Sequence, residues 1–330
     1  MEIGTAFTGF AGEFTPEQAA LRESVRDFFA SPGYSWERLT GELGLTALAV
    51  AEQHGGFGAT AVEAGIVLEE AGAALLCAPL LSTTAAILAL EPSCDLLESL
   101  AGGASIGTLA LGGAVEARPT AQGPVLDGRV HNVLDGAAAD VFLVECDGDL
   151  YATDAAVVQP VPTLDTTRGQ ATVILTATPA RLAVPAGAAH ARAVLQALLA
   201  AESVGVARAA LQSTVDHLRT RRQFGVPLAT FQALRHRVAD LYVALEQATS
   251  TARYALRVHG TEEFAVAATL AKLAATEAAW TVTRESIQLL GGIGFTWEHS
   301  AHRYLKRATA NHLLAGDPAA LRRALLAYAL

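Results

Sequence analysis

The first regular pattern in the chain is a helical one near the N-terminus. Four apolar residues lie at helical spacing and would share one helix face: Leu21, Val25, Phe28 and Phe29. Thr15 precedes Pro16, and Gln18 lies three positions after Thr15, an order typical of a capping box with proline at the first helical position. We therefore expect a helix that begins directly after Thr15.

Helical patterns continue to about residue 100. We expect a second helix over residues 35–50, helices over 60–90 that are interrupted at Pro79, and a short helix ending near Leu100. The run from Ala71 to Leu90 carries no charge and could span a bilayer by length, but Pro79 breaks it and no basic flank orients it. Buried helices in an all-α layer are the better interpretation, and no membrane partner is expected.

The helical period disappears after Gly102-Gly103. Between residues 105 and 187, short β-rich runs alternate with turns, which predicts strands. Four runs are expected to form strands: 106–111, 125–133, 141–146 and 172–176. Asp147-Gly148 follows the third run and favours a hairpin, because a type I′ turn needs positive φ at both positions. We expect a small antiparallel sheet or barrel-like domain.

From about residue 189 the chain is helical again. Four long helical patterns follow one another and a short last helix begins at Asp317-Pro318, with the long patterns over 191–220, 229–259, 261–290 and 298–316. The order of these patterns predicts an α+β protein with three domains: an N-terminal helical domain (1–104), a middle antiparallel β domain (105–188) and a C-terminal helical bundle (189–330).

Composition limits the possible partners and compartments. The net charge of −10 over 330 residues argues against a nucleic-acid partner. Three widely spaced cysteines in no metal or redox motif fit a reducing cytoplasm better than a disulfide scaffold, and residues 1–13 lack the basic region of a signal peptide. His299 and His302 would share one helix face, but no third ligand is evident, so no metal site is expected. The sequence therefore predicts a cytoplasmic protein without a metal.

Positive charge gathers in one stretch, from Arg219 to Asp240, between two long helical patterns. It contains five arginines, namely Arg219, Arg221, Arg222, Arg235 and Arg237. Guanidinium groups and helix termini separated by a short break suit an anion such as pyrophosphate, and Phe224 is close enough in sequence to cover a planar ring. The alternative is a solvated turn with ordinary surface arginines, and composition alone does not decide between the two.

Three stretches of the chain together resemble the signature motifs of the acyl-CoA dehydrogenase family. They occur in the family's order and at family-like spacing. They are Leu43-Gly44-Leu45 through Ala51-Glu52-Gln53-His54-Gly55-Gly56-Phe57-Gly58 to Leu68-Glu69-Glu70-Ala71-Gly72; Arg221-Arg222-Gln223-Phe224-Gly225 with Phe231-Gln232; and Gln288-Leu289-Leu290-Gly291-Gly292-Ile293-Gly294-Phe295-Thr296.

The resemblance implies a fold, a reaction and a cofactor. The fold is an N-terminal helical domain, a middle β domain and a C-terminal four-helix bundle. The reaction is α,β-dehydrogenation of an acyl-CoA thioester with FAD as cofactor and electron-transfer flavoprotein as acceptor. The residues carried over to the flavin site are Arg221 and Gln223 at the pyrophosphate, Phe224 on adenine, and Gln288, Gly291 and Gly292 where the backbone approaches the cofactor.

The family's catalytic base has no counterpart at its expected place. Aligned on Gly291-Gly292, the family's glutamate falls at Ala315, which cannot take a proton. Asp317 is expected to be a helix N-cap before Pro318. The family's flavin wall and threonine-containing substrate segment in the middle domain also lack clear matches.

The residues kept are those that, in the family, reach across a subunit interface to a neighbour's flavin. The segment from Gly294 to Arg307 resembles subunits of bacterial heteromeric acyl-CoA dehydrogenases, some of which act on steroid side chains. The first hypothesis is therefore one half of a heteromer, a heterotetramer active in fatty-acid or steroid side-chain degradation, whose second acyl-CoA dehydrogenase-like subunit supplies the base.

Two other hypotheses remain open. In the second hypothesis the chain acts alone with a displaced base. Family members that carry the base on the first bundle helix place it nearest to Leu195, and Glu202 lies about two turns further on. For Glu202, pairing with a nearby arginine is the favoured interpretation. The last hypothesis is a non-catalytic scaffold of the same fold, against which the retained arginine and glycine motifs count.

Overall fold

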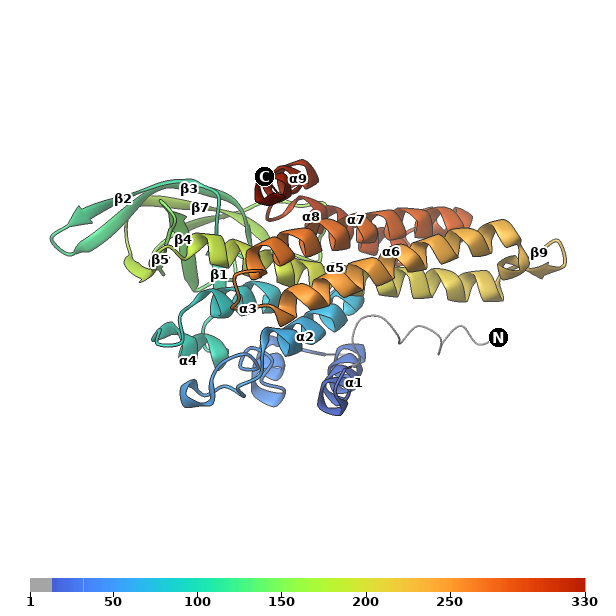
Figure 1. Ribbon diagram of the computed structural model, residues 1–330, viewed down its shortest axis with the longest axis horizontal. Helices are drawn as coiled ribbons and strands as arrows, with labels where there is room; N and C mark the ends of the chain where they lie inside the picture. Colours follow the sequence, from blue (N-terminus) through green and yellow to red (C-terminus); the bar gives the residue numbers. More distant parts are fainter. Residues whose placement is uncertain (1–13, 32, 330) are drawn as a thin grey trace. The chain divides into compact units, whose positions relative to one another are not determined.

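A computed structural model of the protein describes residues 14–31 and 33–329 (Figure 1). Helices come first, then strands, then helices again, in the order that the hydrophobic pattern predicts. The expected α+β fold is therefore confirmed.

The first helix begins as its capping residues predict. Helix α1 spans Pro16–Ala30 and buries Val25 and Phe29. The Thr15 backbone N–H donates to Gln18 Oε1 at 3.1 Å, and the Gln18 N–H donates to Thr15 Oγ1 at 3.3 Å. The two hydrogen bonds form the capping box.

The helix expected over residues 35–50 is wrong in extent. The regular part of this segment is a short π-helix, Arg38–Glu42, and turns follow it to residue 50. Gly44 has φ +59°, a left-handed conformation that ends a helix, and a β-carbon there would lie 2.5 Å from the Phe57 ring. The glycine thus turns the chain under Phe57, and the apolar residues that follow are buried without forming a helix.

Three further helices precede the strands. The break at Pro79 is confirmed, because α2 ends before it and α3 begins directly after it. These helices are α2 (Ala61–Ala74), α3 (Leu80–Ala89) and α4 (Leu96–Ala101). Almost every residue of α3 is buried, including Ser82, Thr83 and Thr84, so its lack of charge reflects a core position.

The strands form two four-stranded sheets. One has the order β1-β4-β5-β8 and the other β2-β3-β7-β6. All pairs are antiparallel except β1 with β4. The bounds are β1 (Gly107–Ala110), β2 (Ala114–Thr120), β3 (Gly123–Leu134), β4 (Val141–Cys146), β5 (Asp149–Thr153), β6 (Val157–Pro160), β7 (Gln170–Pro179) and β8 (Arg181–Val184).

The predicted hairpin is confirmed, but three strands were missed. Asp147 and Gly148 connect β4 to β5 with φ of +50° and +88°, as a type I′ turn requires. The missed strands β2, β6 and β8 are largely exposed or short, so they lack the apolar alternation that marks a half-buried strand. Apolar residues of the strands, among them Leu126, Phe142 and Val173, form the hydrophobic core of the β region.

Five helices complete the chain. Helix α6 begins three residues later than predicted, because a 3-10 turn follows Pro227. The bounds are α5 (Ala188–Thr220), α6 (Gln232–Arg257), α7 (Phe264–Leu290), α8 (Ala301–Leu313) and α9 (Pro318–Ala329). Helix α5 is long and apolar enough to cross a membrane. However, 89% of its most apolar 18-residue stretch is buried within the protein, as in the core helix of a globular domain.

The chain divides into two compact units. Among the described residues, one unit combines 14–30, Gly65–Leu76 and 199–329; the other combines 31–64 without residue 32 and Cys77–Leu198. Both units draw on segments that are distant in sequence. The predicted boundaries at 104/105 and 188/189 follow the order of secondary structure and stay a prediction. The candidate site described next lies within the first unit.

Candidate functional site

The arginine-rich stretch between α5 and α6 forms a small hairpin (Figure 1). Its strands are β9 (Arg222–Gln223) and β10 (Val226–Pro227), which pair antiparallel. Phe224 and Gly225 form the turn, with φ of +53° and +80°. Arg222 Nη2 donates to the Gly225 carbonyl at 2.9 Å, so Arg222 closes the turn from within.

The side chains at the tip of this hairpin face away from the protein. Phe224 is 88% exposed, and its ring meets Phe231 edge-to-face with centroids 6.0 Å apart. Arg221 and Gln223 are also exposed. A fully exposed phenylalanine held at a left-handed φ is typical of a surface that another molecule covers.

Few of the stretch's arginines are neutralised. Arg237 Nη2 lies 3.1 Å from Glu285 Oε2, and Arg219 Nη1 lies 3.9 Å from Asp216 Oδ1. Among the described residues, no carboxylate forms an ion pair with Arg221 or Arg235. Unpaired guanidinium groups remain available to an anionic ligand.

The glycine motif lies at the end of α7. Gly291 adopts φ +66° and ψ −141°, a backbone conformation that residues other than glycine rarely adopt. Its N–H donates to the Gln288 carbonyl. A β-carbon at Gly291 or at Gly292 would meet no atom within 4 Å. The glycines therefore leave open space over the backbone instead of making room for another part of the chain.

These two segments lie at the same end of the helical bundle. Ser286 Oγ on α7 donates to the Ala210 carbonyl on α5 at 3.4 Å, and the Arg237–Glu285 pair joins α6 to α7. Burial lowers the pKa of His217, and the nearby charges of His299 and Arg221 lower it further. The structure thus brings the predicted arginine and glycine motifs to one end of the bundle.

Exposed apolar side chains continue along this end. Ile293, Phe295 and Trp297 are 41%, 75% and 82% exposed, at alternate positions after α7. Lys306 Nζ lies 4.7 Å from the centre of the Trp297 ring, and the His302 ring lies 4.6 Å from it. His299 Nδ1 accepts a hydrogen bond from the Ala301 N–H at 3.1 Å. The described residues contain no group of three or more potential metal ligands.

Ala315 lies in the turn between α8 and α9. It has φ +56° and is followed by Gly316 at φ +113°. Asp317 Oδ1 accepts the Ala320 N–H at 2.8 Å, and this hydrogen bond lowers the pKa of the carboxyl. Asp317 is therefore the N-cap of α9, as predicted.

Glu202 lies in a fully enclosed polar cluster. It is 2% exposed; Arg307 Nη1 donates to its Oε1 and Asn311 Nδ2 to its Oε2, both at 2.8 Å. Arg307 Nη2 also donates to the Leu76 carbonyl at 3.1 Å. The favoured pairing of Glu202 with an arginine is present: Arg307 binds one carboxylate oxygen, and the Asn311 amide binds the other.

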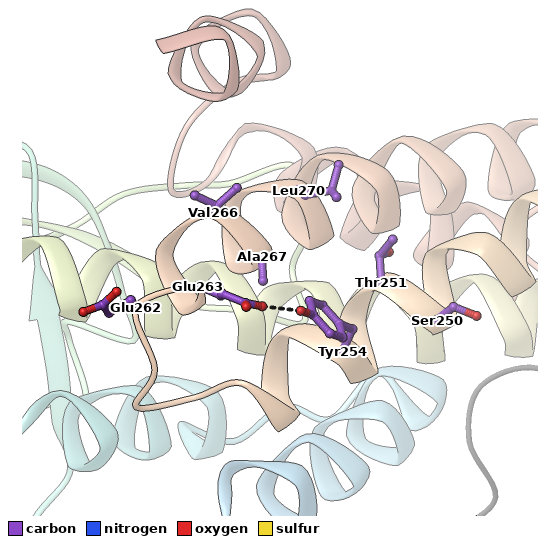
Figure 2. A pocket seen from close by; sticks show the side chains of 8 residues that line it. All are labelled: Ser250, Thr251, Tyr254, Glu262, Glu263, Val266, Ala267 and Leu270. Atoms are coloured by element: carbon purple, nitrogen blue, oxygen red, sulfur yellow. Dashed lines mark hydrogen bonds between the residues drawn. The ribbon is translucent and has the colours of Figure 1, made fainter. Parts of the chain in front are cut away.

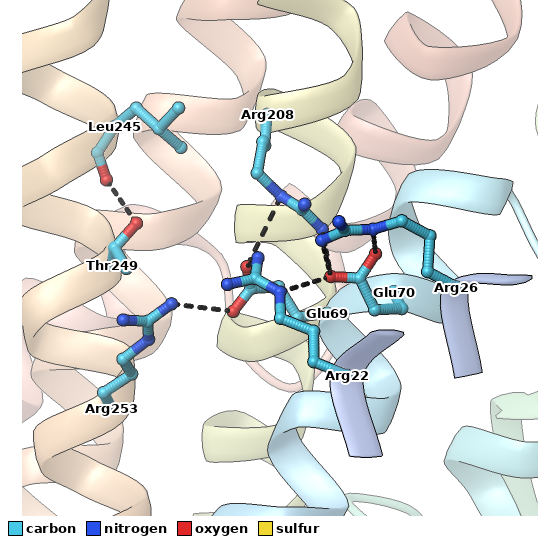
Figure 3. Close-up of polar contacts among 8 residues, drawn as sticks. All are labelled: Arg22, Arg26, Glu69, Glu70, Arg208, Leu245, Thr249 and Arg253. Atoms are coloured by element: carbon cyan, nitrogen blue, oxygen red, sulfur yellow. Dashed lines mark hydrogen bonds and ion pairs between the residues drawn. The ribbon is translucent and has the colours of Figure 1, made fainter. Parts of the chain in front are cut away.

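A second charged network was not predicted from the sequence (Figure 3). The buried carboxylates of Glu69 and Glu70 on α2 meet arginines from three other helices, namely Arg22, Arg26, Arg208 and Arg253. Burial raises the pKa of Glu70, but hydrogen bonds and charges from Arg26, Arg208 and Arg22 outweigh it and bring the pKa to about 2. Two adjacent glutamates after an apolar run were the available signal.

An open hollow of about 620 Å³ lies between the last turns of α6 and the first turns of α7 (Figure 2). Tyr254, Val266 and Leu270 give it an apolar lining, and the Tyr254 hydroxyl donates to the Glu263 carboxylate at its edge. None of the predicted site residues lines it. The hollow is at the opposite end of α6 from the arginine hairpin.

Known proteins resemble the chain over most of its length. Residues 187–330 match the family described as "Acyl-CoA dehydrogenase, C-terminal domain". The acyl-CoA dehydrogenase IpdE2 of Mycolicibacterium smegmatis is 38% identical over 312 residues, which cover 92% of this chain and 91% of that protein. IpdE2 of Mycobacterium tuberculosis is 38% identical over 89% of this chain and 87% of that protein.

Solved structures share the fold. The Tcur3481-Tcur3483 steroid ACAD superposes with a TM-score of 0.87 at 28% identity, covering 94% of this chain and 97% of the matched chain. A chain of the ChsE4-ChsE5 complex from Mycobacterium tuberculosis superposes with a TM-score of 0.86 at 24% identity, covering 96% and 98% of the two chains.

Proposed function

Since the chain belongs to the acyl-CoA dehydrogenase family, we propose that it is an FAD-binding subunit of a heteromeric acyl-CoA dehydrogenase. The family is FAD-dependent and its members are oxidoreductases. The observation that carries the finer proposal is the contrast between a complete, exposed arginine hairpin and an alanine at the position of the base.

The residues at the end of the bundle fit a flavin dinucleotide that belongs largely to another subunit. Arg221 and Gln223 are free to bind pyrophosphate, and the exposed face of Phe224 can pack on adenine. Gln288 is exposed beside Gly291 and Gly292, over which a ligand can approach the backbone. All these groups point outward, which suits a cofactor shared across an interface.

The proposed substrate is an acyl-CoA thioester. FAD, when bound, accepts the hydride from the β carbon. A base must remove the α proton, and neither Ala315 nor Asp317 suits that role. Ala315 has no titratable group, and Asp317 is engaged in capping α9. The base would accordingly come from a second acyl-CoA dehydrogenase-like subunit.

Similar proteins support the heteromeric arrangement and suggest the kind of substrate. The Tcur3481-Tcur3483 protein is a steroid ACAD, and ChsE4-ChsE5 is a complex. By analogy we propose an acyl-CoA from fatty-acid or steroid side-chain degradation, a heterotetramer in the cytoplasm, and electron-transfer flavoprotein as the acceptor.

The test is to measure bound flavin and acyl-CoA oxidation for the chain alone and after co-production with a second acyl-CoA dehydrogenase-like chain encoded beside it. We expect no flavin and no activity for the chain alone, and both for the co-purified pair. Full activity of the chain alone would overturn the heteromer, and a colourless, inactive pair would favour a scaffold.

The second candidate, a self-sufficient enzyme with Glu202 as the base, predicts a different result for Glu202→Gln. Because Glu202 accepts two hydrogen bonds in a buried cluster, we expect this substitution to lower the free energy of unfolding by about 3–5 kcal/mol. The control is Glu285→Gln, which breaks the more exposed pair with Arg237 and should cost about 0–1 kcal/mol. A Glu202→Gln protein of normal stability that has lost only turnover would instead identify Glu202 as the base.

A further inference from the structure

Lys272 is a buried cation that the proposed function does not use. It lies in the middle of α7, is 0% exposed, and is among the largest fully buried side chains of the protein. No carboxylate forms an ion pair with it among the residues that the structure describes. A buried ammonium without a carboxylate partner is costly, so its retention needs an explanation.

The side chain of Lys272 ends at the turn between α8 and α9. Its Nζ donates to the Gly316 carbonyl at 3.4 Å, a contact that spans 44 positions of the sequence. This turn holds Ala315 at φ +56° and Gly316 at φ +113°. A non-glycine residue in the left-handed region persists when its surroundings impose the conformation.

Backbone and side-chain contacts also hold the two sides of the turn. The Leu314 N–H donates to the Ala310 carbonyl at the end of α8, and Asp317 caps α9 through the Ala320 N–H. The Gly316 carbonyl lies between these two fixed points. The Lys272 ammonium donates to that carbonyl from α7, a helix that packs against both α8 and α9.

We propose that Lys272 is a positioning residue, which in its charged form holds the Gly316 carbonyl and thereby sets the conformation of Ala315 and the entry into α9. The proposal concerns the chain's own backbone and goes beyond the proposed function. Its consequence for the reaction rests on that function, because the turn contains the position that corresponds to the family's base.

The surroundings make this tether sensitive to pH. Burial lowers the pKa of Lys272 to about 7, although the charge of Asp317 raises it. His312 on α8 is the other titratable group near it. Burial and then the charge of Lys272 lower the pKa of His312, its Nδ1 is buried without a hydrogen-bond partner, and its ring stacks on Trp280. Lys272 can therefore exchange its proton near neutral pH.

Two further charged groups act on this cluster from α7 and α9. Glu277 and Arg322 pair with each other and influence His312 with opposite signs. Because the two charges are paired and largely cancel, they leave Lys272 as the group whose protonation changes the hydrogen bond to the turn.

The experiment measures amide hydrogen exchange over residues 314–321 in the full chain, within the assembly if one forms. Lys272→Met keeps the length of the side chain but removes the donor. We expect it to speed exchange of this segment about tenfold, as the loss of one charged hydrogen bond would. The matched control is Thr283→Val on the same helix, which removes a buried hydroxyl bonded within its own helix and should leave the segment unchanged.

A pH series separates a tether from ordinary packing. After correction for intrinsic exchange rates, protection of residues 314–321 in the wild type should fall as the pH rises from about 6 to 8, while Lys272→Met should show low, pH-independent protection. Lys272→Gln, which keeps a donor without the charge, should give intermediate protection that does not depend on pH. Equal exchange in the wild type and Lys272→Met, or a segment whose protection is unaffected by pH in the wild type, would overturn the proposal.

This measurement does not depend on catalysis. A failed heteromer test with a positive exchange result would reject the proposed function and keep the role of Lys272. A successful heteromer test with a negative exchange result would keep the proposed function and reject the role of Lys272.

Discussion

Two turns at helix ends share one backbone conformation, a non-glycine residue at positive φ followed by a glycine at positive φ, but they differ in what surrounds it. In the hairpin after α5, Phe224 and Gly225 have φ of +53° and +80°; in the turn after α8, Ala315 and Gly316 have φ of +56° and +113°. At the hairpin the strained residue has a large side chain that is 88% exposed. At the second turn it is an alanine beside a carbonyl held by a fully buried lysine.

The comparison teaches where each turn receives its support. The α8–α9 turn is held from inside the chain, by Lys272 and by the Asp317 cap. The hairpin holds itself through Arg222 and leaves its aromatic ring uncovered. Strain that is not explained by internal contacts points to a function outside the chain, which in our proposal is a flavin and a partner subunit.

One large expected effect tests the outward role of the hairpin. Arg221→Gln should weaken retention of FAD by the assembly by about 1.5–3 kcal/mol, because it removes charge-assisted hydrogen bonds to a phosphate. Equilibrium titration of FAD against flavin-free assembly measures the change. Arg219→Gln is the control, since Arg219 is also exposed but lies beside Asp216. If both variants keep full flavin occupancy, the hairpin is not the clamp.

The second effect tests the inward role of Lys272 through global stability. Its pKa of about 7 in the folded protein lies below the usual 10.5, so between these values the unfolded chain binds a proton that the folded chain does not. Stability should therefore rise with pH above about 7, and the full cost of burying the charge applies below it. We expect Lys272→Met to be more stable than the wild type by about 2–4 kcal/mol near pH 6.

The difference between the two proteins should shrink as the pH rises toward 10, because the wild-type amine then becomes neutral in the fold. Urea unfolding at a series of pH values measures it, and all other titrating groups are common to both proteins. Lys272→Met would thus have a higher free energy of unfolding than the wild type, while its amides at the α8–α9 turn would exchange faster. A wild type that is the more stable protein at pH 6 would show that the buried charge has a partner that stabilises it.

A smaller effect is expected from Phe224→Ala. The ring contributes little to the fold because it is 88% exposed, so the free energy of unfolding should change by less than about 0.5 kcal/mol. FAD affinity should fall by about 0.5–1.5 kcal/mol if the ring stacks on adenine. Leu164→Ala provides the control, as Leu164 is 61% exposed and belongs to the other compact unit. A loss of stability without a loss of affinity would make Phe224 a structural residue.

Features set by neighbouring residues were predictable from the sequence. The capping box at Thr15, the turn at Asp147-Gly148 and the cap at Asp317 each depend on contacts within three positions, and all three are present. The helix expected over 35–50 was wrong, because a conformation forced by packing of Gly44 under Phe57 outweighed the helical pattern. Contacts between neighbouring residues thus predicted where helices begin and strands turn, but they did not predict the extent of every helix.

Contacts between distant parts of the sequence could not be predicted. Lys272 reaches Gly316 across 44 positions, and Arg208 reaches Glu70 across 138. For the candidate site, the resemblance supplied the residues, and the structure added their shared location at one end of the bundle. It also added the open space over Gly291 and Gly292, which no pattern in the sequence encodes.

The smallest effect distinguishes the two turns directly. Ala315→Gly relieves a left-handed alanine and should stabilise the protein by about 0.5–1 kcal/mol, after the added freedom of the unfolded chain is taken into account. Activity of the assembly should not change, because the methyl group carries no proton. Phe224→Gly relieves the same strain but removes the exposed ring, so it should bind FAD less tightly without becoming less stable. If Ala315→Gly instead abolishes turnover while stability rises, the methyl group contacts the reacting molecules, and the α8–α9 turn has an outward function as well.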